Sequence, residues 1–156
     1  MRIVGIDPGT ITAGWGVVDC EAGRASRAVA WGAIRAPKKD PVPERLATIA
    51  RGLDEVLREH SPEVASIEEA FYGESAQSAL RIGEARGAAI VACRLRDVRV
   101  EQFTPAEVKK AVTGNGRAHK SQVARMVKTL LNLDEEPTPA DAADALAVAL
   151  ALCHRL

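Results

Sequence analysis

The chain has 156 residues, 47% hydrophobic and 27% charged, which suits one ordinary domain with a buried core. Its 21 basic and 21 acidic residues cancel, which excludes a uniformly basic surface, so the distribution of charge matters more than its sum. An apolar run begins at Arg2 without a leader or membrane-span pattern, so we expect a soluble, unsecreted protein that does not contact a membrane. Cys20, Cys93 and Cys153 lack CxxC spacing, so we expect reduced, buried thiols rather than a disulfide or a zinc site.

Hydrophobic patterning predicts an α/β protein. Short apolar runs predict strands at residues 3–6, 13–19, 27–35, 64–67 and 98–103. Apolar residues spaced by three and four, an Ala- and Gly-rich stretch, and proline-initiated stretches predict helices at 43–60, 75–95, 105–112, 123–131 and 139–154, the last with Thr138 as its N-cap. The first three strands form an antiparallel meander, and the first helix makes the fourth strand a parallel crossover, so the sheet is mixed.

Four carboxylates lie against apolar sequence, where solvated acids are not expected: Asp7, Glu68, Asp141 and Asp144. Removing an ionised carboxylate from water costs on the order of several kcal/mol unless a partner or cation compensates it. Asp7 and Glu68 each follow a buried strand, and parallel neighbours would bring both to the carboxyl edge of the sheet. Strand alternation points Glu69 to the opposite face, which favours Glu68. A shared divalent metal site explains the set.

Each acid also has a simpler explanation. An acid before Pro-Gly, such as Asp7, commonly just begins a turn. Thr138 and Asp141 match a capping box. Asp144 is harder to explain, because it is the only charged residue from Ala142 to Cys153 and shares a helical face with Asp141. Carboxylate ligands suit Mg²⁺ or Mn²⁺, and two such ions about 4 Å apart can support phosphodiester hydrolysis.

A basic window without Asp or Glu spans residues 109–128 and contains Lys109, Lys110, Arg117, Lys120, Arg125 and Lys128. Lys120 lies near a predicted helix start, where backbone N–H groups and a cation together can engage a phosphate, and Lys109 could act likewise. Isolated charges at Arg125 and Lys128 favour a solvated helix face. Phe71 and Tyr72 follow Glu68, and both core packing and stacking on an unpaired base remain open for them.

Several stretches in order resemble the motifs of one known family, the RuvC-type Holliday junction resolvases of bacteria. The resemblance covers nearly the whole chain and is carried by Gly5-Ile6-Asp7-Pro8-Gly9, Ile67-Glu68, the stretch from Ala79-Leu80 to Gly87, His119-Lys120-Ser121-Gln122-Val123 and Ala140-Asp141-Ala142-Ala143-Asp144-Ala145-Leu146-Ala147. It implies a single RNase H-like nuclease domain over residues 1–156, with a five-stranded mixed sheet of order 3-2-1-4-5 and helices on both faces.

The resemblance also implies an activity and its partners. A cytoplasmic homodimer would bind four-way junction DNA and nick opposing strands symmetrically during recombination and DNA repair, together with a branch-migration motor complex. The subunit contact is expected near residues 83–93. Matching these motifs residue by residue implies that the four acids bind two Mg²⁺ ions per site, and that Mn²⁺ can substitute. It also implies that Lys120 takes part in catalysis with the acids. The implied DNA-binding residues are Lys109, Lys120, Phe71 and Arg117.

Two rival functions remain open at this point. Asp7-Pro8-Gly9-Thr10 fits the first phosphate loop of ATP-binding proteins of the actin and sugar-kinase superfamily, although those proteins need a second domain and another Gly-rich loop. An inert junction-binding module is the other alternative. Four clustered acids argue against it, because without metal they would repel one another.

Overall fold

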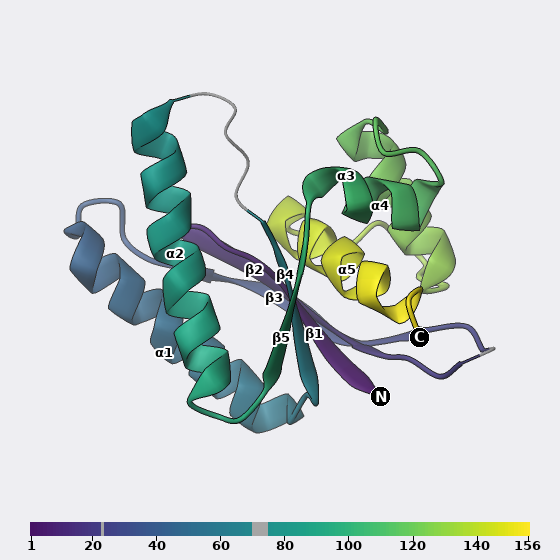
Figure 1. Ribbon diagram of the computed structural model, residues 1–156, viewed down its shortest axis with the longest axis horizontal. Helices are drawn as coiled ribbons and strands as arrows, with labels where there is room; N and C mark the ends of the chain where they lie inside the picture. Colours follow the sequence, from purple (N-terminus) through teal and green to yellow (C-terminus); the bar gives the residue numbers. More distant parts are fainter. Residues whose placement is uncertain (23, 70–74) are drawn as a thin grey trace.

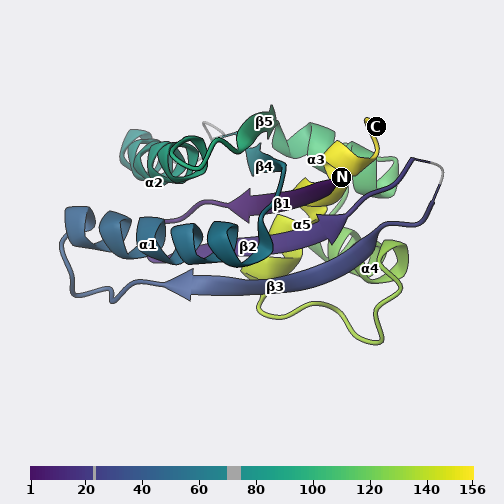
Figure 2. The same ribbon diagram turned by 90° about the horizontal axis from the view of Figure 1, so that it is seen from below.

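The computed structural model describes residues 1–22, 24–69 and 75–156, so Phe71 and Tyr72 lie outside the described residues. Its centre is a sheet of the strands β1 (Arg2–Asp7), β2 (Thr12–Asp19), β3 (Arg27–Arg35), β4 (Val64–Glu68) and β5 (Arg99–Phe103). The strand order β3-β2-β1-β4-β5 confirms the prediction, and Figure 2 shows it edge to edge. β1, β2 and β3 are antiparallel, whereas β4 runs parallel to both β1 and β5.

Helices cover both faces of the sheet, as predicted (Figure 1). Their bounds are α1 (Val42–His60), α2 (Ala76–Arg94), α3 (Pro105–Thr113), α4 (Lys120–Leu130) and α5 (Ala140–Cys153). α1 and α2 lie on one side of the sheet, and α3, α4 and α5 lie on the other (Figure 1). Each side therefore has its own hydrophobic core.

The two cores follow from different sequence patterns. α1 is amphipathic and buries one stripe, represented by Ile49 and Leu53, against the sheet. α5 is buried at most of its positions between Ala142 and Leu152, because the sheet lies beneath it and α3 and α4 flank it. A charged residue in α5 is therefore held in place by dense packing. No helix in the described part of the chain is long and apolar enough to cross a bilayer.

The cysteines correct one prediction. Cys20 and Cys153 form a disulfide, with Cα atoms 5.7 Å apart, so the expectation of reduced thiols is wrong for this pair. Cys20 directly follows β2 and Cys153 ends α5, and packing of these elements unites residues 133 positions apart. No local spacing could reveal that pairing. Cys93 is a free, buried thiol, and burial raises its pKa to about 12.

Candidate active site

The parallel pairing of β1 and β4 brings two of the predicted acids to the same edge of the sheet. Ile6 pairs with Ile67 in register, and Asp7 and Glu68 are the last residues of their strands. Both side chains are half-buried, whereas Glu69 is exposed and its N–H donates to the Phe103 carbonyl over 2.7 Å. The structure thus separates Glu68 from Glu69 as strand alternation predicts.

The first turns of α5 carry the other two acids, and only one of them faces the pocket. Asp144 lines the same pocket as Asp7 and Glu68, whereas Asp141 does not line it. Pro139, not Thr138, is the N-cap of α5, and no side chain makes a capping hydrogen bond there. The predicted N-cap is therefore wrong by one residue, since the helix begins later, at Ala140. The capping explanation for Asp141 fails with it.

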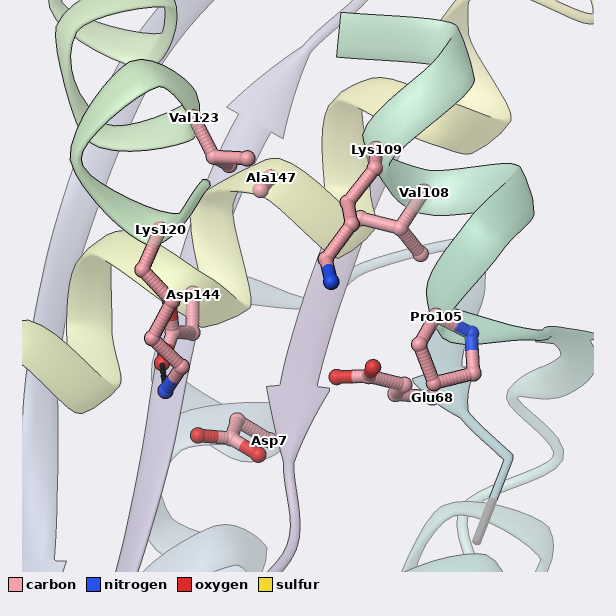
Figure 3. A pocket seen from close by; sticks show the side chains of 9 residues that line it. All are labelled: Asp7, Glu68, Pro105, Val108, Lys109, Lys120, Val123, Asp144 and Ala147. Carbon is pink, nitrogen blue, oxygen red and sulfur yellow. Dashed lines mark hydrogen bonds and ion pairs between the residues drawn. The ribbon is translucent and has the colours of Figure 1, made fainter. Parts of the chain in front are cut away.

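Two helices complete the pocket on the side opposite the sheet edge. Lys109 projects from α3 and Lys120 from the first residue of α4, and both amino groups point toward the acids (Figure 3). The pocket has a volume of about 160 Å³ and its apolar wall consists of Pro105, Val108, Val123 and Ala147. Sequence reasoning missed these four wall residues. Their positions relative to the predicted site residues could have revealed three of them. Val108 adjoins Lys109, Val123 lies three residues after Lys120, and Ala147 lies three residues after Asp144.

The acids repel one another in a place where water screens them poorly. Burial, and after it the negative charges of Asp144, Glu68 and Asp141, raise the pKa of Asp7 to about 7, against an opposing effect of Lys120. Burial, and after it the charge of Asp144, also raises the pKa of Glu68. Asp141 therefore acts on Asp7 electrostatically although it lies outside the pocket lining. The site holds more negative charge than its surroundings neutralise.

Lys120 supplies part of the missing positive charge. Its Nζ lies 3.0 Å from Oδ2 of Asp144, and this hydrogen bond, together with the charge of Asp144, raises the pKa of Lys120. The Lys120 side chain is 80% exposed, but that of Asp144 is only 25% exposed. The ammonium thus reaches in from solvent and leaves Asp7 and Glu68 without an ion pair of their own among the described residues.

The donor set fits a hard divalent cation. All four acids offer oxygen atoms, which Mg²⁺ and Mn²⁺ prefer, and no His or Cys lines the pocket as zinc would require. Within the described ranges, no three His, Cys, Asp or Glu side chains stand close enough together to hold one ion. The raised pKa of Asp7 is nevertheless the mark of a position where a bound cation would relieve repulsion.

The remaining predicted DNA-binding residues lie away from this pocket or cannot be placed. Arg117 is exposed in the loop between α3 and α4, where its N–H donates to Oδ1 of Asn115 over 2.9 Å. Phe71 lies outside the described residues.

The sequence did not predict the role of His119 in positioning Lys120. His119 is the N-cap of α4, and its ring accepts from the Ser121 N–H while Gln122 completes a capping box. The sequence signal was the helix start after Gly114-Asn115-Gly116.

An RNase H-like sheet with acids at the ends of β1 and β4, a third pocket acid on α5 and two lysines facing them is compatible with the active site of a metal-dependent nuclease. The family model described as crossover junction endodeoxyribonuclease RuvC matches residues 3–154. The chain belongs to this family.

Individual relatives agree with the family match. The chain is 47% identical to a crossover junction endodeoxyribonuclease RuvC of Caldanaerobacter subterraneus subsp. tengcongensis, over 99% of this chain and 93% of that protein. The corresponding protein of Alkalilimnicola ehrlichii is 49% identical over 98% of this chain and 90% of its own length. Thermus thermophilus RuvC, solved in complex with a Holliday junction substrate, has a TM-score of 0.90 and 37% identity, covering 97% of this chain and 92% of that one. These matches decide against the ATP-binding alternative.

Proposed function

We propose that this protein is a structure-selective endonuclease that resolves four-way (Holliday) DNA junctions by symmetric paired nicks in recombination and DNA repair. The observation that carries the proposal is the convergence of Asp7, Glu68 and Asp144 with Lys109 and Lys120 in one pocket, in a chain of the RuvC family. The whole of residues 1–156 would act as one nuclease domain. The reaction is metal-dependent hydrolysis of a phosphodiester bond.

The acids would hold the metal. Asp7, Glu68 and Asp144 face the pocket, and we propose Asp141 as a fourth ligand, since it lies on α5 three residues before Asp144 and its charge acts on Asp7. We propose two Mg²⁺ ions per site, with Mn²⁺ able to substitute. Bound metal would supply an activated water and charge stabilisation at the leaving oxygen. The half-buried Asp7 must be ionised to bind, so metal binding should strengthen as the pH rises through about 7.

The lysines would engage the scissile phosphate. Lys120 is the first residue of α4, where the helix dipole also favours an anion. Lys109 stands across the pocket on α3 (Figure 3). Lys120 is thus both a neutralising partner of Asp144 and a phosphate ligand, which makes it the lysine closest to the chemistry. We assign backbone contacts further along the DNA to Arg117 and disturbance of base pairing to Phe71.

A cleavage assay tests this function directly. We expect a synthetic four-way junction to receive paired symmetric nicks with Mg²⁺ or Mn²⁺, while a linear duplex of the same sequence stays intact. Chelator and Asp7→Asn should each abolish nicking without abolishing junction binding. ATP is included as a control for the discarded alternative. Cleavage of duplex and junction at equal rates, or nicking that survives chelator, would contradict the proposal.

We propose a homodimer formed through α2, because two symmetric nicks require two active sites related by a two-fold axis. The outer surface of α2 exposes Leu80, Val91 and Leu95 to 68%, 56% and 81%. A Cβ at Gly83 or Gly87 would meet nothing within 4 Å, so this surface is open to close approach by another backbone. An apolar groove between α1 and α2 adjoins it, lined by Leu46, Ala47, Ala50, Gly87, Ala88, Val91, Ala92 and Leu95, with Arg51 and Asp54 at its rim.

Light scattering distinguishes the dimer from a monomer. Val91→Asp places a charge in the proposed contact and should shift the protein to a monomer that binds one DNA arm poorly and no longer nicks in pairs. Leu156→Asp is the matched control, because Leu156 is an exposed apolar residue of similar exposure, 53%, outside α2. A wild-type monomer at working concentration, or an equal effect of both variants, would contradict the α2 contact.

The proposed activity also indicates where the protein works and with what. We propose that it acts in the bacterial cytoplasm, because the proposed substrate, four-way DNA, would form there during recombination. Cooperation with a branch-migration motor complex rests on family membership. Co-sedimentation of the protein with a motor-loaded junction, compared with the junction alone, would test it.

A further inference from the structure

The helix that carries Asp141 and Asp144 lies unusually close to the sheet. Three glycines of β1 and β2 form the floor beneath α5, because at each a Cβ would collide with the helix: Gly5, Gly14 and Gly16. At Gly5 it would stand 2.7 Å from the Ala149 nitrogen, and at Gly14 it would meet the Asp141 carbonyl. Gly5 pairs with Gly16 across the two strands. The glycine floor therefore fixes the height of α5 above the sheet.

Such a floor does not fix the position of the helix along its own axis. Helices that pack through side chains are held in register because ridges of one surface fill grooves of the other. Under this part of α5 the floor offers backbone instead of ridges. Apolar side chains beside the floor, such as Ile3 and Val64, also pack with α5, but such packing is not directional, so a directional contact would add to the resistance against sliding of α5 over the glycines.

Ser66 provides that contact. It lies on β4, pairs in register with Gly5, and is the one polar side chain that is fully buried among the described residues. Its hydroxyl donates to the carbonyl of Val148 on α5 over 2.7 Å. Val148 lies one helical turn beyond Asp144, and Ser66 lies two residues before Glu68 on the same strand face. One hydrogen bond thus links the strand of one pocket acid to the helix of another.

We propose that Ser66 is a positioning residue for the metal site: its hydrogen bond to Val148 fixes α5 along β4 and so sets the spacing of Glu68 and Asp144. This role rests on the proposed metal-dependent nuclease function and specifies how the site is held in shape. A hydrogen bond is directional and short, so it resists displacement of less than one residue. A metal site needs its ligands held to about 0.5 Å, which is the scale of such a displacement.

Ser66→Ala isolates this role. The change removes only the hydroxyl, and the Val148 carbonyl keeps its place in the hydrogen-bond pattern of α5, so no buried acceptor is orphaned. Folding should survive. The expected signature is a looser metal site in a folded protein.

The test measures Mn²⁺ binding to the DNA-free protein by electron paramagnetic resonance, together with the dependence of junction nicking on Mg²⁺. We expect Ser66→Ala to raise the half-saturating Mn²⁺ concentration about five- to tenfold and to slow nicking most at low Mg²⁺, with junction binding in chelator unchanged. Ile49→Val is the control, since Ile49 is a buried residue of α1 on the opposite face of the sheet, and its change loosens that core without touching α5. It should bind Mn²⁺ as the wild type does.

The possible outcomes distinguish the positioning role of Ser66 from the metal-dependent nuclease function. If the wild type binds Mn²⁺ and Ser66→Ala binds it equally well, the positioning role is overturned while the nuclease function stands. A wild type that binds no Mn²⁺ overturns the metal assignment and the positioning role with it. An equal weakening in Ser66→Ala and Ile49→Val would show a general effect of stability, which also overturns the role of Ser66.

Discussion

At the scale of single residues, the surroundings of Asp7 disfavour its charged form. Its pKa is raised to about 7 from an ordinary value of 3.8, mainly by burial and then by the neighbouring acids. Between these pH values the folded protein binds more protons than the unfolded chain, so its stability falls as the pH rises through this window and the loss is complete above about pH 7. A residue placed for function thus destabilises the metal-free fold.

Asp7→Asn should therefore stabilise the protein while abolishing its activity. Each unit of pKa shift corresponds to about 1.4 kcal/mol, and because the acids share their repulsion we expect a gain of about 1–3 kcal/mol at pH 8 in chelator. At pH 4 the neutral Asp7 resembles asparagine, and the gain should vanish. Urea unfolding at both pH values measures it. A variant less stable than the wild type at pH 8 would show that Asp7 is not strained by its neighbours.

Lys120 should separate catalysis from binding. Lys120→Ala removes the cation nearest Asp144, and loss of one such charge at a reacting phosphate commonly costs about 100-fold in rate. Junction affinity should fall far less, by about tenfold at most, since other basic residues remain. Lys128→Ala, a loss of equal charge in the last turn of α4 and away from the pocket lining, should leave the nicking rate near that of the wild type. Equal losses of nicking rate in both variants would mean that Lys120 contributes only its positive charge and has no specific role at the scissile phosphate.

At the scale of elements, the start of α4 depends on His119. The His119 ring accepts from the Ser121 N–H, and the His119 N–H donates to Oε1 of Gln122 over 2.9 Å. This cap holds the first turn, and with it the backbone of Lys120, over the pocket. Histidine is an uncommon N-cap, whereas asparagine is among the preferred ones.

His119→Asn should keep or improve the stability of the protein, while His119→Ala should lower the free energy of unfolding by about 1 kcal/mol. The nicking rate should follow the same order, because a frayed first turn releases Lys120. Thermal unfolding and cleavage of the junction measure the two effects. If both variants lost equal stability, the ring of His119 would matter for a contact other than the cap.

At the scale of elements, the sequence predicts the helices and strands but not the contacts between elements that lie far apart in the chain. Apolar periodicity, as around Leu53, and short apolar runs predicted the helices and strands of the described part of the chain with bounds close to those observed, because these elements bury one continuous face or run. The same apolar runs show where these strands end, so they also predicted that Asp7 and Glu68 lie together at one edge of the sheet. The glycine floor under α5, the hydrogen bond of Ser66 and the Cys20–Cys153 disulfide were not predicted, since each depends on how distant elements approach one another. Thr138 shows that helix starts shift by a residue when a proline competes for the cap.

At the scale of the whole molecule, a net charge of zero conceals a separation of charge. The acids gather at the carboxyl edge of β1 and β4, and the basic window of residues 109–128 borders them on α3 and α4. The proposed dimer surface on α2 lies across the sheet from these helices (Figure 1). DNA would thus meet the face that bears the lysines, while α2 remains available to a second copy.

Junction binding should accordingly depend steeply on salt despite the neutral total. Each phosphate neutralised by a basic residue releases condensed counterions, so the logarithm of the affinity falls linearly with the logarithm of the salt concentration. Lys109→Ala should reduce the magnitude of this slope by about 1, because Lys109 faces the pocket where a phosphate would lie. Lys39→Ala removes the same charge from the turn between β3 and α1, away from the pocket lining, and should leave the slope unchanged. Fluorescence anisotropy in chelator at several salt concentrations gives the slopes, and a flat response in the wild type would mean that charge on this face does not hold the DNA.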